Sequence, residues 1–195
     1  MRMIFALGTI VFAATSFATE PTPPNYYPLA KGTKWEYRLS TDEGEFAVTC
    51  QITEVENKEG RFFARMEAKL PHGTLEEVLS ADSRGVYRNA ILGAKLQEPL
   101  MIIKYPIKAR EEWKDKMKLG ENDGTYSIAV KNTAAVIEVP AGKFTTLAIE
   151  SSVELNGEKC GASIWYADGI GIVKQEMTSG SKVITMELKN FTSPK

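Results

Sequence analysis

The sequence predicts a mainly β protein with little helix, in which neighbouring strands pair as an antiparallel meander. Alternation between residues 62 and 70 is the first observation, as in a half-buried strand. One face carries Phe62, Ala64, Met66, Ala68 and Leu70, and the other carries Phe63, Arg65, Glu67 and Lys69. Asp168-Gly169 and Asn156-Gly157 are the second, because both dipeptides favour the tight turn of a β-hairpin. The third is that no segment has the length and period of a substantial helix.

The other strands are predicted by the same alternation. In the first half it covers residues 35–37 and 46–52, and turn-forming clusters lie at 41–44, 56–60 and 71–73. In the second half it covers residues 126–130, 137–139, 147–155, 162–167, 170–173 and 184–188. Short turns between strands of this length place sequence neighbours side by side in one sheet.

The middle of the chain is less regular. Residues 91–99 have no clean period, and the apolar run Leu100-Met101-Ile102-Ile103 follows. This run is either a strand buried on both faces or the lining of an apolar pocket. The candidate lining residues are Leu100, Ile102, Tyr105 and Trp113. The mixed-charge stretch 108–118 is either a short helical segment or a polar crossover between two halves.

Two pairs of similar motifs predict an internal pseudo-repeat. Residues 81–88 and 167–174 share Ala-Asp, then Gly, a β-branched residue and a basic residue at matching spacing. Tyr27-Pro28 and Tyr105-Pro106 each precede a tryptophan, Trp35 or Trp113, by the same distance. The predicted halves are residues 27–96 and 105–191.

The N-terminus predicts export. Residues 1–18 combine Arg2, an apolar run and small residues near Ala18, which is typical of a signal peptide cleaved after Ala18. A Pro-rich leader at 19–25 and a single β domain at 26–195 follow. Cleavage removes one of the 24 basic residues and leaves 23 against 25 acidic residues, a formal charge of −2. We therefore expect a secreted or periplasmic protein with no membrane span after cleavage and no nucleic-acid partner.

The usual catalytic patterns are missing from the sequence. His72 is the single histidine, it lies between Pro71 and Gly73, and a zinc site or catalytic triad would depend on this one turn residue. Adjacent acidic residues such as Glu76 and Glu77 point to opposite faces of a strand and cannot converge. There is no phosphate-binding loop or dinucleotide fingerprint. We therefore expect no enzyme, no cofactor and no metal site.

Cys50 and Cys160 form a candidate disulfide. Each is in phase with the apolar face of its predicted strand, and an even cysteine number in an exported protein favours a bond. Two separate buried thiols are the alternative.

Several motifs resemble a group of exported bacterial proteins of unknown function. They are Tyr26-Tyr27-Pro28-Leu29 with Trp35, residues 100–107, residues 139–144, and Trp165-Tyr166-Ala167 with Gly169, Gly171 and Lys174. Members are similar to the lipoprotein-localisation-factor type of fold. The resemblance therefore implies a strongly curved antiparallel sheet, a half-barrel or open barrel, that shelters an acyl chain or another apolar ligand. It carries no catalytic residues.

Three hypotheses of function follow. The first is an envelope binding protein that holds a lipid or other apolar molecule on the concave face of the sheet. The second is a structural or interaction protein that presents a sheet edge or its leader to another envelope protein. The third, a hydrolase, has the least support because the polar constellations are missing.

Overall fold

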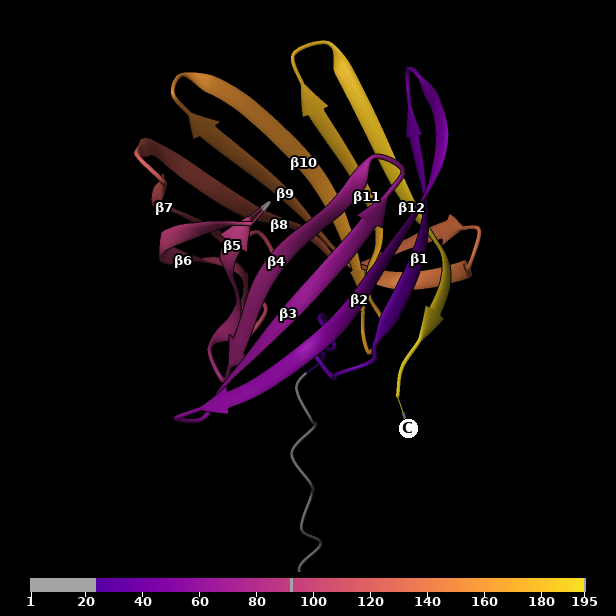
Figure 1. Ribbon diagram of the computed structural model, residues 1–195, viewed down its shortest axis with the longest axis horizontal. Helices are drawn as coiled ribbons and strands as arrows, with labels where there is room; N and C mark the ends of the chain where they lie inside the picture. Colours follow the sequence, from indigo (N-terminus) through magenta and orange to yellow (C-terminus); the bar gives the residue numbers. More distant parts are fainter. Residues whose placement is uncertain (1–23, 92, 195) are drawn as a thin grey trace, which may run out of the picture.

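The computed structural model describes residues 24–91 and 93–194. In this part of the chain twelve strands follow one another with no helix between them (Figure 1). The strands are β1 (Lys34–Thr41), β2 (Gly44–Lys58), β3 (Arg61–Leu70), β4 (Gly73–Asp82), β5 (Gly85–Ile91), β6 (Ala94–Lys104), β7 (Glu112–Leu119), β8 (Asn122–Val139), β9 (Gly142–Leu155), β10 (Glu158–Ala167), β11 (Gly171–Ser179) and β12 (Lys182–Thr192). The predicted mainly β fold and its antiparallel meander are confirmed.

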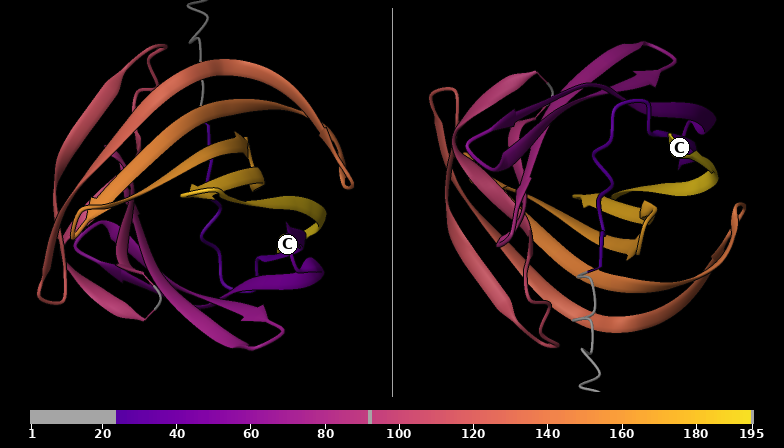
Figure 2. Two further views of the ribbon diagram at one scale, coloured as in Figure 1. Left: turned by 90° about the horizontal axis from the view of Figure 1, so that it is seen from above. Right: turned by 90° about the horizontal axis from the view of Figure 1, so that it is seen from below.

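The sheet closes on itself, so the expected half-barrel is wrong. Each strand pairs with its sequence neighbours, and β1 also pairs with β12, from Lys34–Thr192 to Ser40–Thr185. The continuous twist and curvature of the sheet bring the last strand to the first, and closure satisfies the backbone groups that two edge strands would leave free. Figure 2 shows the strands enclosing an interior when the molecule is seen from above and below.

The junction between β6 and β7 is much weaker than the junction between β1 and β12. Only Leu96 and Leu119 pair across it. Side chains replace part of the missing ladder: Trp113 Nε1 donates to the Met101 carbonyl oxygen at 2.8 Å, and the Met101 amide donates to Tyr126 Oη at 3.4 Å. The barrel is therefore closed along one junction by a full ladder and along the other mainly by aromatic side chains.

The structure also corrects the prediction for the mixed-charge stretch 108–118. Most of it is β7 rather than a helical segment or a crossover. Trp113 and Met117 pack against the core, whereas Lys114, Asp115 and Lys116 between them are exposed. Lysine is typical of strands with an unpaired edge, because its charge opposes further strand pairing.

The barrel has two different ends. Since consecutive strands run in opposite directions, the turns after β1, β3, β5, β7, β9 and β11 lie at one end, which we call the mouth. The remaining turns and the C-terminal end of β12 lie at the other end, which we call the base. Figure 1 shows the hairpins fanning apart towards the mouth.

Residues 24–33 cross the base. Asn25 is held by the turn after β10: its amide donates to Asp168 Oδ1 at 2.7 Å, and its carbonyl oxygen accepts from the Gly169 amide at 2.9 Å. Further along, the Gly32 amide donates to the Ile52 carbonyl oxygen at 2.8 Å. In the view from below (Figure 2, right), the segment crosses this end of the barrel. The predicted signal peptide, 1–18, lies outside the described residues, as does the leader up to residue 23.

The predicted pseudo-repeat can be placed on the strands. Residues 27–96 hold β1 to β5 and the start of β6, and residues 105–191 hold β7 to β11 and nearly all of β12. Residues 82–85 and 167–171 both form turns at the base, after β4 and β10. The repeat itself stays a prediction.

Candidate functional site at the mouth of the barrel

Aromatic side chains fill the base. Tyr27, Trp35, Tyr37 and Tyr166 are all buried, and the ring of Tyr27 lies 6.2 Å from the rings of Trp35 and Tyr166. Trp35 Nε1 donates to the Ile170 carbonyl oxygen at 2.6 Å, and Tyr37 Oη donates to the Ile172 carbonyl oxygen at 2.9 Å. Burial raises the pKa of Tyr166, while the nearby charge of Arg88 lowers it and that of Glu77 raises it. This end of the interior is a packed core.

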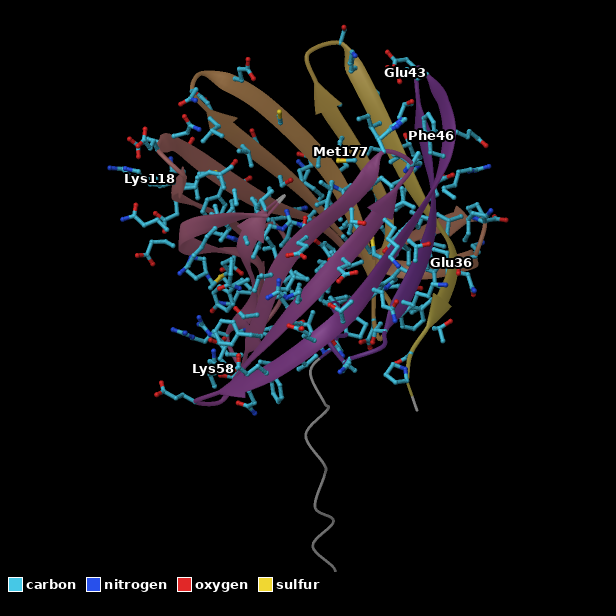
Figure 3. The ribbon with its side chains drawn as sticks, in the orientation of Figure 1. Glu36, Glu43, Phe46, Lys58, Lys118 and Met177 are labelled. Carbon is cyan, nitrogen blue, oxygen red and sulfur yellow. The ribbon has the colours of Figure 1, made fainter. Side chains whose placement is uncertain are left out.

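The core-facing side of the sheet becomes accessible towards the mouth. On β4, the exposed fraction rises from 0% for Leu79 to 37% for Leu75, four residues closer to the mouth. The same change occurs on other strands, where buried residues near the base give way to half-buried apolar ones on the same face. The half-buried residues are Leu39, Phe46, Ala68, Leu70, Ala162, Met177, Ile184 and Met186. Figure 3 shows Phe46 and Met177 at the end where the hairpins fan apart.

A cleft of about 250 Å³ lies in this part of the interior. Its apolar walls come from three separate hairpins: Leu39 and Phe46, Leu70 and Pro71, and Ile184. His72, the single histidine, is exposed at its rim, with its ring 6.5 Å from that of Phe46. Lys182, Asp42 and Glu43 also line it. Apolar walls of this kind can hold an alkyl group.

An ion pair lies at the level where the interior changes from filled to accessible. Glu77 is between Leu75 and Leu79 on the core-facing side of β4, and Arg88 is opposite Leu79 on β5. Arg88 Nε lies 3.2 Å from Glu77 Oε2. Burial opposes the charge of Arg88, but the charge of Glu77 and the nearby Tyr27 and Tyr166 outweigh it, so the pKa of Arg88 is raised. Arg88 therefore keeps its charge inside the barrel, beside Glu77.

The ion pair leaves hydrogen-bonding capacity unused. Among the described residues, Arg88 Nε and Glu77 Oε2 are buried against each other, and their contact at 3.2 Å lacks the geometry of a good hydrogen bond. A guanidinium group has five N–H donors and a carboxylate can accept at two oxygens. This site can therefore bind further charged or polar groups.

A larger hollow, about 870 Å³, lies on the opposite face of the sheet over β7 to β12. Its floor follows paired positions with small side chains: Ser127 pairs with Ser152, and Ser152 with Gly161. Ion pairs flank it, with Lys131 Nζ 3.0 Å from Glu150 Oε2 and Lys174 Nζ 2.8 Å from Glu176 Oε1. Hydroxyl and carboxylate groups line part of this hollow, so an alkyl chain there would lie beside polar side chains.

The predicted lining residues lie apart from the cleft at the mouth. Leu100 and Ile102 are buried in the core, and Tyr105 and Trp113 are half-buried against it. Trp113 also lines the outer hollow. Alternation predicts apolar strand faces for Phe46, Leu70 and Ile184, but it carries no signal for their accessibility. The sequence does carry a signal for Glu77, because this residue interrupts the apolar positions Leu75 and Leu79 on one strand face.

The predicted disulfide is absent from the structure. Cys50 is buried in β2, and Cys160 is exposed in β10 near the mouth. Three strands, β1, β12 and β11, separate β2 from β10 along the sheet. A disulfide requires Cα atoms within about 7 Å, which is little more than one interstrand spacing of about 4.8 Å.

Two other kinds of site were searched for in the described part of the chain. No three or more His, Cys, Asp or Glu side chains gather there in a way that could hold a metal ion. Within residues 24–91 and 93–194, no helix is long and apolar enough to cross a membrane.

The fold is similar to that of two solved structures. One is a candidate lipoprotein from Parabacteroides distasonis ATCC 8503, with a TM-score of 0.58 and 14% identity, covering 88% of this chain and 100% of the other. The second is a candidate exported protein with a YmcC-like fold from Bacteroides fragilis NCTC 9343, with a TM-score of 0.58 and 12% identity, covering 86% of this chain and 98% of the other. No family model and no curated protein matches the chain. At these identities the likeness concerns the fold alone.

Proposed function

We propose that this chain is an exported, non-enzymatic binding protein of the bacterial envelope that holds the alkyl chain of an amphiphile in the mouth of its barrel. One observation carries the proposal: the apolar, core-facing side of the sheet is filled at the base and accessible at the mouth. Export is supported by the signal-peptide pattern in residues 1–18 and by the descriptions of the two structural neighbours.

The energetics favour an alkyl chain at the mouth. Each methylene group removed from water contributes about 0.8 kcal/mol, and the half-buried leucine, methionine and isoleucine side chains at the mouth would lose exposed surface at the same time. The cleft alone is smaller than the roughly 300–1,000 Å³ of typical ligand pockets. An alkyl chain would therefore extend from the cleft along the inner face of β10 to β12.

The proposal that the protein is non-enzymatic rests on the position of its histidine and carboxylates. His72 is at an exposed rim, and Glu77 is paired with the guanidinium group of Arg88. Neither arrangement provides a nucleophile with an adjacent general base.

Native mass spectrometry tests the proposed function. Protein exported in a bacterial host and purified without detergent is expected to carry extra mass that organic extraction removes. The extracted protein should then bind an added single-chain amphiphile at a ratio of one to one. Protein that carries no extractable molecule and binds no amphiphile after extraction would contradict the proposal.

The weak junction between β6 and β7 favours a second candidate function, in which this edge of the sheet binds an envelope protein. With a single residue pair across it, much of the backbone of β6 and β7 has no strand partner on that side. Crosslinking from a photoreactive residue at Lys116, an exposed position on β7, should then capture a partner in a fixed ratio. The same probe at Lys159 on β10 is the control, and equal capture from both positions would contradict this candidate.

A further inference from the structure

The Glu77–Arg88 ion pair lies at the floor of the accessible part of the interior. On β4, the residue towards the mouth is exposed Leu75, and the residue towards the base is Leu79, which has no exposed surface. The side chains of Arg88 and Glu77 keep 27% and 18% of their surface accessible. Tyr27, Tyr166 and Cys50 lie close to the pair, and its charges influence their pKa values. The leading end of a molecule that enters through the mouth would therefore reach these two charges.

Stability alone does not explain this pair. Removing two charges from water costs several kcal/mol per ion, and well-packed apolar residues in place of a buried pair are often equally stable or more stable. The cost rises when hydrogen bonds are poor, and in the described part of the chain Arg88 Nε and Glu77 Oε2 lie 3.2 Å apart in a geometry that does not make a good hydrogen bond. Further partners from a ligand would offset that cost.

We propose that the Glu77–Arg88 pair binds the zwitterionic head group of the amphiphile, a phosphate ester that carries a primary ammonium group. This inference rests on the proposed function, since it names the class of amphiphile held in the mouth. The phosphate accepts hydrogen bonds from the guanidinium group of Arg88, and the ammonium group donates to the carboxylate of Glu77. The alkyl chain then lies towards the mouth, against Leu75, Leu70 and Ile184.

Charge balance selects a zwitterion over a simple anion. The pair has no net charge, so a purely anionic head group would add an uncompensated negative charge beside Glu77. A cationic head group would likewise add an uncompensated positive charge beside Arg88. Only a head group with both charges leaves the interior neutral and gives each charge an additional partner.

The test compares four amphiphiles with the same twelve-carbon chain on extracted protein. Their head groups are phosphoethanolamine, carboxylate, ammonium and the uncharged sugar maltose. We expect the phosphoethanolamine amphiphile to bind roughly 10- to 100-fold more tightly than the maltoside, which is the effect of one or two charge-assisted hydrogen bonds. Preference for the carboxylate or ammonium amphiphile, or equal binding of all four, would overturn the inference and leave the proposed function intact. If none of the four binds, the proposed function itself fails.

Variants with a matched control test whether the Glu77–Arg88 pair causes the preference for the phosphoethanolamine head group. The double variant Glu77→Leu, Arg88→Met removes the pair without leaving a lone buried charge, so it is expected to fold. Its ratio of phosphoethanolamine to maltoside affinity should fall to about one. The control is the double variant Glu76→Leu, Arg65→Met. It removes an exposed ion pair, joined at 3.0 Å, between Glu76, the residue before Glu77 on β4, and Arg65 on β3. This control should keep the full ratio. A ratio that survives in the Glu77–Arg88 double variant would overturn the inference.

Discussion

The base and the mouth of the barrel are built from the same twelve strands but differ in how their inner faces are used. At the base, Trp35, Tyr37 and Tyr166 are buried and residues 24–33 cover the end. At the mouth, Leu70, Leu75 and Ile184 face the interior yet stay accessible. On β4 the same core-facing side runs from Leu79 at the base to Leu75 at the mouth, so the difference comes from what lies opposite each residue. We infer that the base provides most of the stability and the mouth provides the binding surface.

The largest expected effect is on the stability of the base. Trp35→Ala removes a side chain that is 2% exposed and donates to the Ile170 carbonyl oxygen. Its loss should lower the free energy of unfolding by about 3–5 kcal/mol, measured by urea denaturation. A loss below about 1 kcal/mol would show that the aromatic cluster does not stabilise the base.

A matched pair on β4 compares the two regions directly. Leu79→Ala should lower the free energy of unfolding by about 2–4 kcal/mol, because Leu79 is fully buried. Leu75→Ala, four residues towards the mouth on the same face, should cost less than about 1 kcal/mol. Equal costs in urea denaturation would contradict the distinction between base and mouth.

Low pH should destabilise the base of the barrel, because it protonates Asp82. Burial opposes the charge of this carboxylate, but hydrogen bonds from Arg61 and Arg84 outweigh burial and lower its pKa. A pKa below the unfolded value of about 4 means that Asp82 stabilises the fold above pH 4 and that this contribution is lost as the pH falls.

Asp82→Asn tests this effect. The variant should lower the free energy of unfolding at pH 7 by roughly 1–3 kcal/mol, since it replaces hydrogen bonds to a charged group. The difference from the unmodified protein should shrink as the pH falls from 5 to 2 in urea denaturation. A difference that grows with acid would contradict the sign of the pKa shift.

Two neighbouring residues on β12 compare the inner and outer faces at the mouth. Ile184→Ser should weaken binding of a single-chain amphiphile roughly tenfold, the equivalent of about 1.4 kcal/mol of lost apolar contact. Val183→Ser changes the outer face, where the side chain is 56% exposed, and should leave the affinity unchanged. Fluorescent-probe displacement measures both, and a larger loss in the Val183 variant would favour the outer hollow.

The smallest expected effect is a difference between the two cysteines in their reactivity towards an alkylating reagent. Burial and the nearby charge of Glu77 raise the pKa of Cys50 to about 12, whereas Cys160 is exposed. Because the thiolate is the reactive form, alkylation of the folded protein at pH 8 should add one label. Unfolding without a reductant should allow a second. A total of fewer than two labels on the unfolded, unreduced protein would instead support the predicted disulfide.

Much of the fold could be predicted from the sequence, because alternation and turn residues act locally. The turns at 41–44, 71–73 and 156–157 all join strands where expected. Closure of the barrel could not be predicted in this way, since the pairing of β1 with β12 joins residues about 150 positions apart. An open and a closed sheet have the same local pattern, so alternation cannot distinguish them.

Side-chain direction was harder to predict than strand position. The repeated motifs place Arg88 and Lys174 at matching positions, yet Arg88 faces the interior and Lys174 lies over the ring of Trp165 on the outer face. The turns differ: Asp82 pairs with Gly85, whereas Ala167 pairs with Gly171 and a register shift follows. Because successive residues alternate between faces, small changes of this kind decide which charges enter the core. The candidate site at Glu77 and Arg88 therefore required the structure.

Photo-crosslinking tests the central claim most directly. A twelve-carbon amphiphile with a diazirine group on its terminal carbon is bound to extracted protein, irradiated, and located by peptide mass spectrometry. The account predicts adducts on the mouth peptides that contain Phe46, Leu70 and Ile184. Adducts concentrated on the outer hollow around Ser127, Ser152 and Thr178, with none at the mouth, would contradict it.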